Sequence, residues 1–323
     1  MVDNTPPLAN FNRHDHAVVS SLYTESYASA VIILAHSLKL ANVTTPLILL
    51  YIPSRISLST LCLVRAAGWT PHPVVRIPPP PHPKRVPIGY IDQYTKLHIW
   101  TLDTLGIKSL IYLDADTIVR RNFDELFTLP FTFAAVPDVF SFRFELGFNA
   151  GMLFIRPNSS IFQDMLSKLQ VAQYDRGGAE QAFLNVYFAA QVVKLPYSYN
   201  ANIAIKLRSP NLWQTLQNDR MHVVHYTLDK PFLVNGHDAV NIKKLEDLEP
   251  ILESTKGLGG GMWTDEFGWW EVIWRETMVT NRDAFAQCSS TWLTLAESQR
   301  ATLEPPTADR GRYLHNAAPR LLR

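Results

Sequence analysis

Short apolar runs and segments of helical periodicity alternate over the first two thirds of the chain, and this alternation restricts the fold more than any other feature. Apolar residues spaced three and four apart predict a helix over Glu25–Leu40. Two further predicted helices, Leu58–Ala67 and Tyr90–Leu105, are each followed by a glycine, which commonly ends a helix. Strands are predicted at His16–Tyr23, Pro46–Ile52, Pro73–Ile77 and Ser109–Leu113. Strand, helix and strand in succession imply crossover connections, so we predict an α/β fold with a mixed, mostly parallel sheet flanked by helices.

Beyond about residue 130 the pattern is less regular, and strands and helices no longer alternate strictly. The segments with strand or helix character are Phe131–Val136, Ala150–Ile155, Gln191–Leu195 and Met221–Tyr226 for strands, and Ile161–Gln170 and Glu180–Ala189 for helices. We divide the chain into a tail over residues 1–15, a main domain over 16–255 and a C-terminal helical extension over 256–323. The extension begins with a glycine-rich hinge, Lys256–Met262.

Tryptophan is concentrated in the extension, where an aromatic stripe follows helical spacing. Its members are Trp263, Phe267, Trp270, Trp274 and Met278. We expect a helix that docks on the main domain. The alternative is that exposed tryptophan faces form part of an acceptor platform, because aromatic rings stack on sugars.

Charge and cysteine content exclude several classes of protein. The 30 basic and 29 acidic side chains give a formal net charge of +1, which argues against a nucleic-acid binder. The two cysteines, Cys62 and Cys288, lie far apart in the sequence, so they exclude a disulfide scaffold and a cysteine-rich zinc site and fit a reducing compartment. No targeting or transmembrane segment is visible, and we expect a cytoplasmic protein. The sequence allows a homodimer.

Two acidic residues, Asp114 and Asp116, follow the apolar strand that ends at Leu113. Like charges disfavour the joint ionisation of neighbouring carboxylates, so such a pair suits a site where a divalent cation lies between the acids and a polyphosphate. In open α/β sheets the ligand crevice lies beyond the carboxyl ends of the strands, which is where this pair falls. The alternative is an ordinary surface turn, since Asp is common in turns.

Several further motifs occur in a fixed order around this pair. They are Tyr94-Thr95-Lys96-Leu97-His98-Ile99-Trp100, Ala134-Ala135-Val136-Pro137-Asp138, Phe148-Asn149-Ala150-Gly151, Glu180-Gln181-Ala182-Phe183-Leu184-Asn185 and His225-Tyr226-Thr227-Leu228-Asp229-Lys230-Pro231-Phe232. In this set and order the chain resembles the glycogenin-like family-8 glycosyltransferases from about His16 to Phe232. The resemblance implies the GT-A fold, a nucleotide-sugar donor and a retaining mechanism.

The resemblance also implies a metal site. Asp114, Asp116 and His225 would be the protein ligands, and two carboxylates with an imidazole suit Mn²⁺ better than Mg²⁺. The metal would bridge the diphosphate oxygens and act as a Lewis acid on the leaving nucleotide. Lys230 would place an ammonium group against the diphosphate.

Other positions would bind the UDP-sugar. Tyr27 would contact the uracil ring, and Lys96 would serve the ribose, phosphate or sugar side. Asp138, Asn149 and Gly151 would line the sugar pocket, because the first two supply hydrogen bonds to hydroxyl groups and glycine allows close approach.

Glu180 and Gln181 occupy a position where the family usually has Asp-Gln. With acceptor and leaving group on the same face of the sugar, Gln181 would stabilise the cationic centre through its amide oxygen, and Glu180 would hold sugar hydroxyls. The extra methylene of Glu180 moves its carboxylate by about 1.5 Å relative to Asp. This departure affects the expected donor sugar.

Two other departures bear on function. The interval between His225 and Lys230 is one residue shorter than usual and lacks the family's glycine. No tyrosine lies between Tyr199 and Tyr226, where self-glucosylation would need an acceptor. We therefore expect an enzyme that is not a self-priming glycogenin.

The sequence predicts transfer of a hexose from UDP-glucose, or next from UDP-GlcNAc or UDP-galactose, to a hydroxyl acceptor on a small molecule or a soluble glycan or protein. Two alternatives stay open. One is a catalytically silent UDP-sugar-binding protein, and the other is a metal-dependent sugar-phosphate nucleotidyltransferase.

Overall fold

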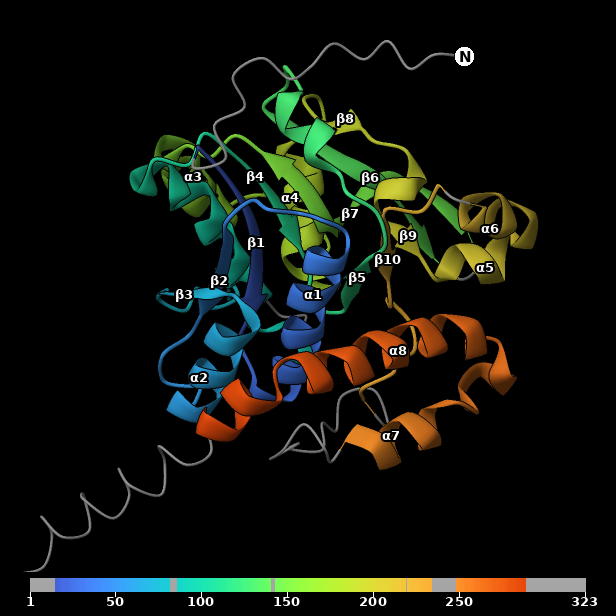
Figure 1. Ribbon diagram of the computed structural model, residues 1–323. Coiled ribbons are helices and arrows are strands. Elements are labelled where there is room, and N and C mark those ends of the chain that lie inside the picture. The colour runs from blue at the N-terminus through green and yellow to red at the C-terminus, as the bar shows by residue number, and fades with distance from the viewer. Residues whose placement is uncertain (1–14, 82–85, 141–142, 219, 234–247, 289–323) are drawn as a thin grey trace, which may run out of the picture.

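A seven-stranded sheet with the order β3-β2-β1-β4-β7-β6-β8 forms the centre of the computed structural model (Figure 1). The structure describes residues 15–81, 86–140, 143–218, 220–233 and 248–288. Most of the predicted tail over 1–15 and the part of the extension beyond Cys288 lie outside the described residues. Four neighbouring strands are parallel to one another: β3 (Thr70–Pro73), β2 (Leu47–Tyr51), β1 (His16–Leu22) and β4 (Ser109–Leu113).

In the other half of the sheet, one strand runs opposite to all the others. Strand β7 (Arg143–Ile155) is antiparallel to both β4 and β6 (Phe133–Phe140), and β6 is parallel to β8 (Val193–Lys194). The prediction of a mixed, mostly parallel sheet in an α/β fold is confirmed.

A smaller sheet with the order β5-β10-β9 stands beside the main one. Strand β5 (Thr117–Val119) comes directly after the acidic pair and is antiparallel to β10 (Val223–His225), which is parallel to β9 (Ala201–Asn202). In this register His225 lies opposite Thr117. A segment more than a hundred residues away in sequence therefore meets the end of β4.

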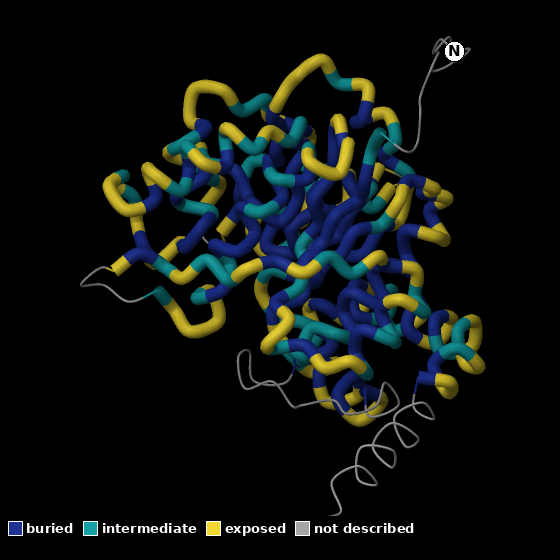
Figure 2. The backbone as a smooth tube through the Cα atoms, turned by 90° about the vertical axis from the view of Figure 1, so that its left-hand side faces the viewer, coloured by how far each residue is buried: buried dark blue, intermediate teal, exposed yellow. Residues whose placement is uncertain are grey.

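Helices cover both faces of the main sheet, which explains why its central strands are apolar throughout. Along β1, Val18 packs into one core with helices α1 (Ala28–Leu40) and α2 (Leu58–Ala67). Its neighbours Ala17 and Val19 belong to a second core. The remaining helices are the 3-10 helix Gln93–Leu105, α3 (Ser159–Leu169), α4 (Ala179–Tyr187), α5 (Ala204–Arg208), α6 (Pro210–Gln217), α7 (Leu248–Thr255) and α8 (Thr264–Thr280). Figure 2 shows the buried strands inside a shell of exposed loops.

Three local predictions differ from the structure. The strand predicted at Pro73–Ile77 is instead β3 at Thr70–Pro73 and stops where its only partner, β2, ends at Tyr51. Proline lacks an N–H group and is tolerated there because β3 lies at the sheet edge. The helix expected from Tyr90 is a 3-10 helix over Gln93–Leu105, and β7 extends well before the predicted Ala150.

The aromatic stripe of the extension lies inside the protein. Trp263, Phe267, Trp270 and Trp274 are each at most 4% exposed, and all four belong to the core that contains α1. Helix α8 crosses close to α1 in Figure 1. These rings are therefore covered by the main domain, which supports the docked helix and excludes them as an acceptor platform. No helix within the described ranges has the length and apolarity that a membrane span requires.

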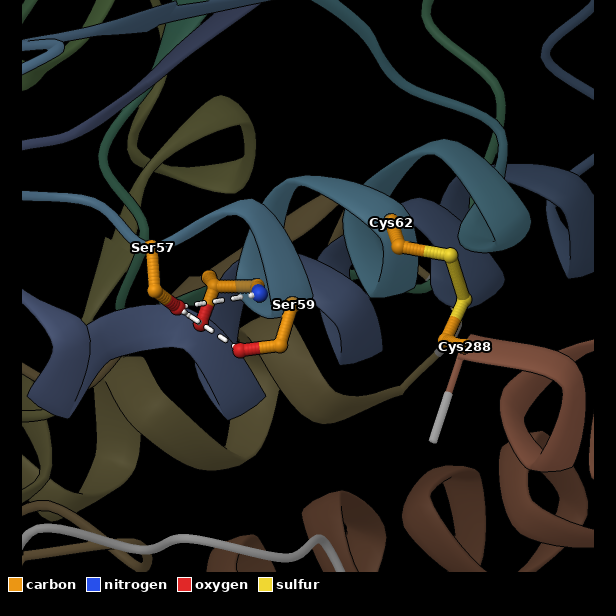
Figure 3. Close-up of a disulfide and its surroundings, with 5 residues drawn as sticks. Ser57, Ser59, Cys62 and Cys288 are labelled. Atoms are coloured by element: carbon orange, nitrogen blue, oxygen red, sulfur yellow. Dashed lines mark hydrogen bonds between the residues drawn. A yellow bond between two sulfur atoms is a disulfide. The ribbon is translucent and has the colours of Figure 1, made fainter. Parts of the chain in front are cut away.

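The two cysteines are joined, contrary to the expectation of a reduced pair. Cys62 on α2 and Cys288, in the helical segment 282–288, form a disulfide across 226 residues of sequence (Figure 3). Sequence distance gave no sign of this pairing, because docking of the extension brings its last described turn against α2. Disulfides persist in oxidising compartments, so the cysteines no longer support the predicted cytoplasmic location.

We predict that loss of this disulfide destabilises the protein. The variant with both Cys62→Ser and Cys288→Ser should lose about 2–4 kcal/mol of unfolding free energy, because a long loop is no longer closed in the unfolded chain. Denaturant unfolding measures this loss. Added reductant should lower the melting temperature of the wild type and leave that of the double variant unchanged; alkylation of both wild-type cysteines under native, non-reducing conditions would contradict the pairing.

We also predict that the protein loses stability below neutral pH. Burial lowers the pKa of His16, His36, His72 and His98 below the ordinary value. As the pH falls through about 6.5, the unfolded chain gains protons that the folded chain does not, so the melting temperature should fall from about pH 7 to pH 5.5. His36→Gln should reduce this slope. A melting temperature that stays constant or rises over this interval would refute the prediction.

Candidate active site

The acidic pair lies at the carboxyl end of β4, all five residues of which are buried. The backbone N–H of Asp114 donates to the carbonyl of Gly151 on β7, at 2.8 Å. The N–H of Tyr226 donates to the carbonyl of Asp116, at 3.0 Å. Both acids are thus fixed between the main sheet and the smaller one.

Asp114, Asp116 and His225 form a cluster that could hold a metal ion. One ligand atom from each lies within 4.8 Å of the others, and His225 Nε2 is 3.2 Å from Asp116 Oδ1. The side chains of Asp116 and His225 are buried, whereas that of Asp114 is 25% exposed. Two carboxylates and one imidazole at this spacing fit a divalent cation such as Mn²⁺.

A hydrogen-bond partner on one side of the His225 ring orients its Nε2 toward the acidic pair. Its Nδ1 lies 3.1 Å from Asn200 Oδ1, an oxygen that can accept from an Nδ1–H group, and its Nε2 faces Asp116. Gly151 packs against the same ring, since a Cβ there would lie 2.1 Å from His225 Cε1. Any side chain at this position would displace the imidazole.

Lys230 contacts the second oxygen of Asp116. Its ammonium donates to Asp116 Oδ2 and to the carbonyl of Tyr226, the latter at 2.7 Å. Burial alone would raise the pKa of Asp116, but Lys230 and His225 together hold that pKa well below its ordinary value. Asp116 therefore stays ionised and able to bind a cation throughout the physiological range.

Asp138, Asn149 and Gln181 form a hydrogen-bonded group beside the cluster. Asp138 accepts from Asn149 Nδ2 at 3.0 Å and from Gln181 Nε2 at 2.8 Å. The backbone N–H of Ala150 donates to Gln181 Oε1 at 2.9 Å, which fixes the orientation of the amide. One lone pair of the Gln181 oxygen is thus occupied, and the other stays available.

Glu180 and Gln181 begin α4 after a strained residue. Ala179 has a φ of 47°, a conformation that residues other than glycine adopt at a cost. Such strain is common at functional sites. The structure places Glu180 Oε1 2.7 Å from the Lys96 ammonium.

Tyr27 belongs to a column of aromatic rings and interacts electrostatically with Lys230 and Asp116. It meets Phe232 edge-on at 5.4 Å between ring centres, and Phe232 stacks on the buried Trp270 at 5.6 Å. Burial raises the pKa of Tyr27 to about 12. The extension thus supports the ring that the sequence assigned to the nucleobase.

Sequence reasoning missed three residues of the site. Asn200 orients His225, and Asn202 donates to the carbonyl of Val139 beside Asp138, at 3.1 Å. Tyr112 donates to Asp114 Oδ1 at 2.8 Å from within β4. The only available signals were an asparagine after Tyr199 and a tyrosine in an apolar strand, and neither points to a site without its tertiary partner.

Comparison with known proteins identifies a family for this region. The profile described as Glycosyl transferase family 8 matches residues 81–233. This range includes all predicted site residues except Tyr27.

Similar plant proteins carry names that describe different activities. Galactinol synthase 1 of Arabidopsis thaliana is 28% identical over 313 residues, covering 84% of this chain and 83% of the relative. Inositol phosphorylceramide glucuronosyltransferase 1 of the same plant is 28% identical over 276 residues, but those cover 76% of this chain and only 48% of the relative.

Solved structures match at the level of the fold. The galactosyltransferase LgtC, crystallised with donor and acceptor sugar analogues, has a TM-score of 0.50 at 20% identity, covering 74% of this chain and 95% of that one. The glycosyltransferase GlyE of Streptococcus pneumoniae TIGR4 also has a TM-score of 0.50 at 20% identity. That match covers 82% of this chain and 63% of GlyE. The expected GT-A fold is confirmed.

We predict that Asn200→Ala weakens metal binding without unfolding the protein. Loss of the acceptor at Nδ1 frees the imidazole to turn or change tautomer, which should reduce Mn²⁺ affinity roughly 10- to 100-fold. Titration calorimetry of Mn²⁺ with UDP measures this loss. The exposed Asn211→Ala on α6 is the control, and equal affinities in the two variants would contradict the assigned role of Asn200.

Proposed function

This chain belongs to glycosyl transferase family 8, and from that premise we propose that it transfers a hexose from a UDP-sugar to a hydroxyl acceptor with Mn²⁺ at Asp114, Asp116 and His225. Nucleotide-sugar-dependent glycosyl transfer with retention is the activity of the family. The single observation that carries the proposal is the cluster of two carboxylates and an oriented imidazole at the end of β4.

The bound cation would neutralise the diphosphate as the nucleotide leaves. The protein's own contribution begins with position: the two sheets hold Asp114, Asp116 and His225 before ligand arrives, so little reorganisation is needed. Lys230 lies against Asp116 and would face the same phosphates. Its three N–H groups can exchange a carboxylate oxygen for a phosphate oxygen.

Gln181 and Asp138 would act on the sugar. The amide of Gln181 is held at both ends, by Ala150 and by Asp138, so its oxygen keeps a fixed place near the centre where positive charge develops. Asp138 also accepts from the N–H of Val139 at 2.9 Å and keeps lone pairs for sugar hydroxyls. Asn149 links this pair to Gly151.

The donor is proposed to be UDP-glucose, UDP-galactose or UDP-GlcNAc. The acceptor is proposed to be a hydroxyl group of a small molecule or of a soluble glycan or protein. Names such as galactinol synthase, among relatives that this chain covers almost fully, favour a small acceptor. The absence of a tyrosine between Tyr199 and Tyr226 supports an external acceptor over self-priming. The homodimer stays a prediction.

We predict that Asp116→Asn abolishes turnover. Release of UDP from UDP-glucose or UDP-galactose with Mn²⁺, with water as acceptor, should fall at least about 100-fold, because a carboxylate ligand and the partner of Lys230 are both lost. A coupled assay for UDP measures the rate.

Asp265→Asn, an exposed position on α8, is the control and should retain the wild-type rate. Thermal shift with UDP and Mn²⁺ separates binding from turnover, because a ligand of the folded state raises the melting temperature. A wild type that neither binds UDP with Mn²⁺ nor releases UDP from any of the proposed donors would refute the proposed function.

A further inference from the structure

Glu180, where this chain departs from its family, is a buried partner of Lys96. Glu180 Oε1 lies 2.7 Å from Lys96 Nζ, and its side chain is 6% exposed. The sequence assigned Glu180 to sugar hydroxyls, but its carboxylate lies beside a buried ammonium.

All three N–H groups of Lys96 have acceptors. Besides Glu180, the ammonium lies 2.9 Å from Asp114 Oδ1 and 3.3 Å from the carbonyl of Ala150. An ammonium has three donors and no acceptor, and the side chain of Lys96 is only 1% exposed. The two carboxylates and the backbone carbonyl thus occupy the three N–H groups of Lys96.

The same arrangement orients Asp114. Its Oδ1 accepts from Tyr112 Oη at 2.8 Å, and Tyr112 in turn contacts Ser21 Oγ at 2.7 Å. Lys96 and Tyr112 both contact Oδ1, so two neighbours restrict the orientation of the Asp114 carboxylate. A shorter acid at position 180 would lie farther from Lys96 by up to about 1.5 Å, the length of one C–C bond, and would hold it less well.

The sugar side of the site is therefore acidic. Asp138 contacts only amide groups there: the side chains of Asn149 and Gln181, the more distant Asn202 at 3.5 Å and the N–H of Val139. Within the part of the chain that the structure describes, no cation lies in hydrogen-bonding distance of Asp138. Lys230 is bonded to Asp116, at the phosphate end.

Resting on the proposed function, we propose that Glu180 determines donor specificity by holding Lys96 against Asp114. The sugar pocket is then left with carboxylates and amides, which bind neutral hydroxyl groups and repel the carboxylate of a uronic acid. The distinction matters because relatives of this chain include glucuronosyltransferases. The donor of this enzyme is a neutral hexose.

The test compares donors by release of UDP with Mn²⁺ and water as acceptor. In this reaction the bond from C1 to the diphosphate oxygen breaks with its electron pair on the diphosphate, the water oxygen bonds to C1, and one proton of that water passes to the departing UDP. The wild type should prefer UDP-glucose or UDP-galactose over UDP-glucuronate on the order of 100-fold in kcat/KM, because like charges in a poorly solvated pocket cost several kcal/mol. In Glu180→Gln the preference should fall at least about tenfold, since the pocket loses one negative charge and Lys96 is freed in part.

Glu180→Asp is the second variant and should fall between the wild type and Glu180→Gln, because its shorter side chain holds Lys96 less well. Glu253→Gln, at an exposed position on α7, is the matched control and should keep the wild-type ratio. A gain in the relative use of UDP-glucuronate cannot come from misfolding, which lowers both rates together.

Calorimetry with Mn²⁺ and UDP, which lacks the sugar, separates the possible failures. If the wild type binds UDP and its kcat/KM for UDP-glucuronate equals that for the neutral donors, the specificity assignment is overturned while the proposed function stands. If Glu180→Gln binds UDP normally and keeps the wild-type ratio, Glu180 has no part in specificity. If the wild type binds neither UDP nor any UDP-sugar, the proposed function itself fails.

Discussion

The antiparallel pairing of β5 with β10 is the interaction on which the site depends. It places His225 opposite Thr117, directly after the acidic pair, and brings its Nε2 to 3.2 Å from Asp116. Without this short ladder, the imidazole would not be held beside the two carboxylates at the tip of β4. Asn200 and Gly151 then restrict the imidazole, one by a hydrogen bond and the other by the space that glycine leaves. A cation site is therefore built from backbone pairing first and from side-chain chemistry second.

Two lysines balance the acids of this site in different ways. Lys230 meets Asp116 near the phosphate end and is 15% exposed, so an incoming anion can reach it. Lys96 is enclosed by Asp114, Glu180 and a backbone carbonyl. Buried charges are tolerated when they are paired and fully hydrogen-bonded. Lys230 is thus the lysine of this pair that solvent reaches, whereas the contacts of Lys96 are all with protein groups.

The C-terminal helices are part of the site's support. Trp270 on α8 stacks on Phe232, which in turn contacts Tyr27. The buried Glu266, also on α8, accepts hydrogen bonds from Lys206 and Trp213 of the main domain. The disulfide from Cys62 to Cys288 secures the end of this extension on α2, whose first turn is capped by Ser57. A segment that sequence composition separates from the main domain is thus continuous with its core.

Periodicity alone determined much of the fold: β4 and α2 have the predicted bounds, because a fully buried strand and a helix closed by glycine carry their signals locally. The order of motifs likewise pointed to Asp114, Asp116 and His225. Only the tertiary structure decided what depends on distant partners. Examples are the disulfide, the orientation of His225 by Asn200, and the ion pair between Glu180 and Lys96. Hydrogen bonds and ion pairs form between atoms that meet in space, and a sequence records the donors and acceptors but not which of them meet.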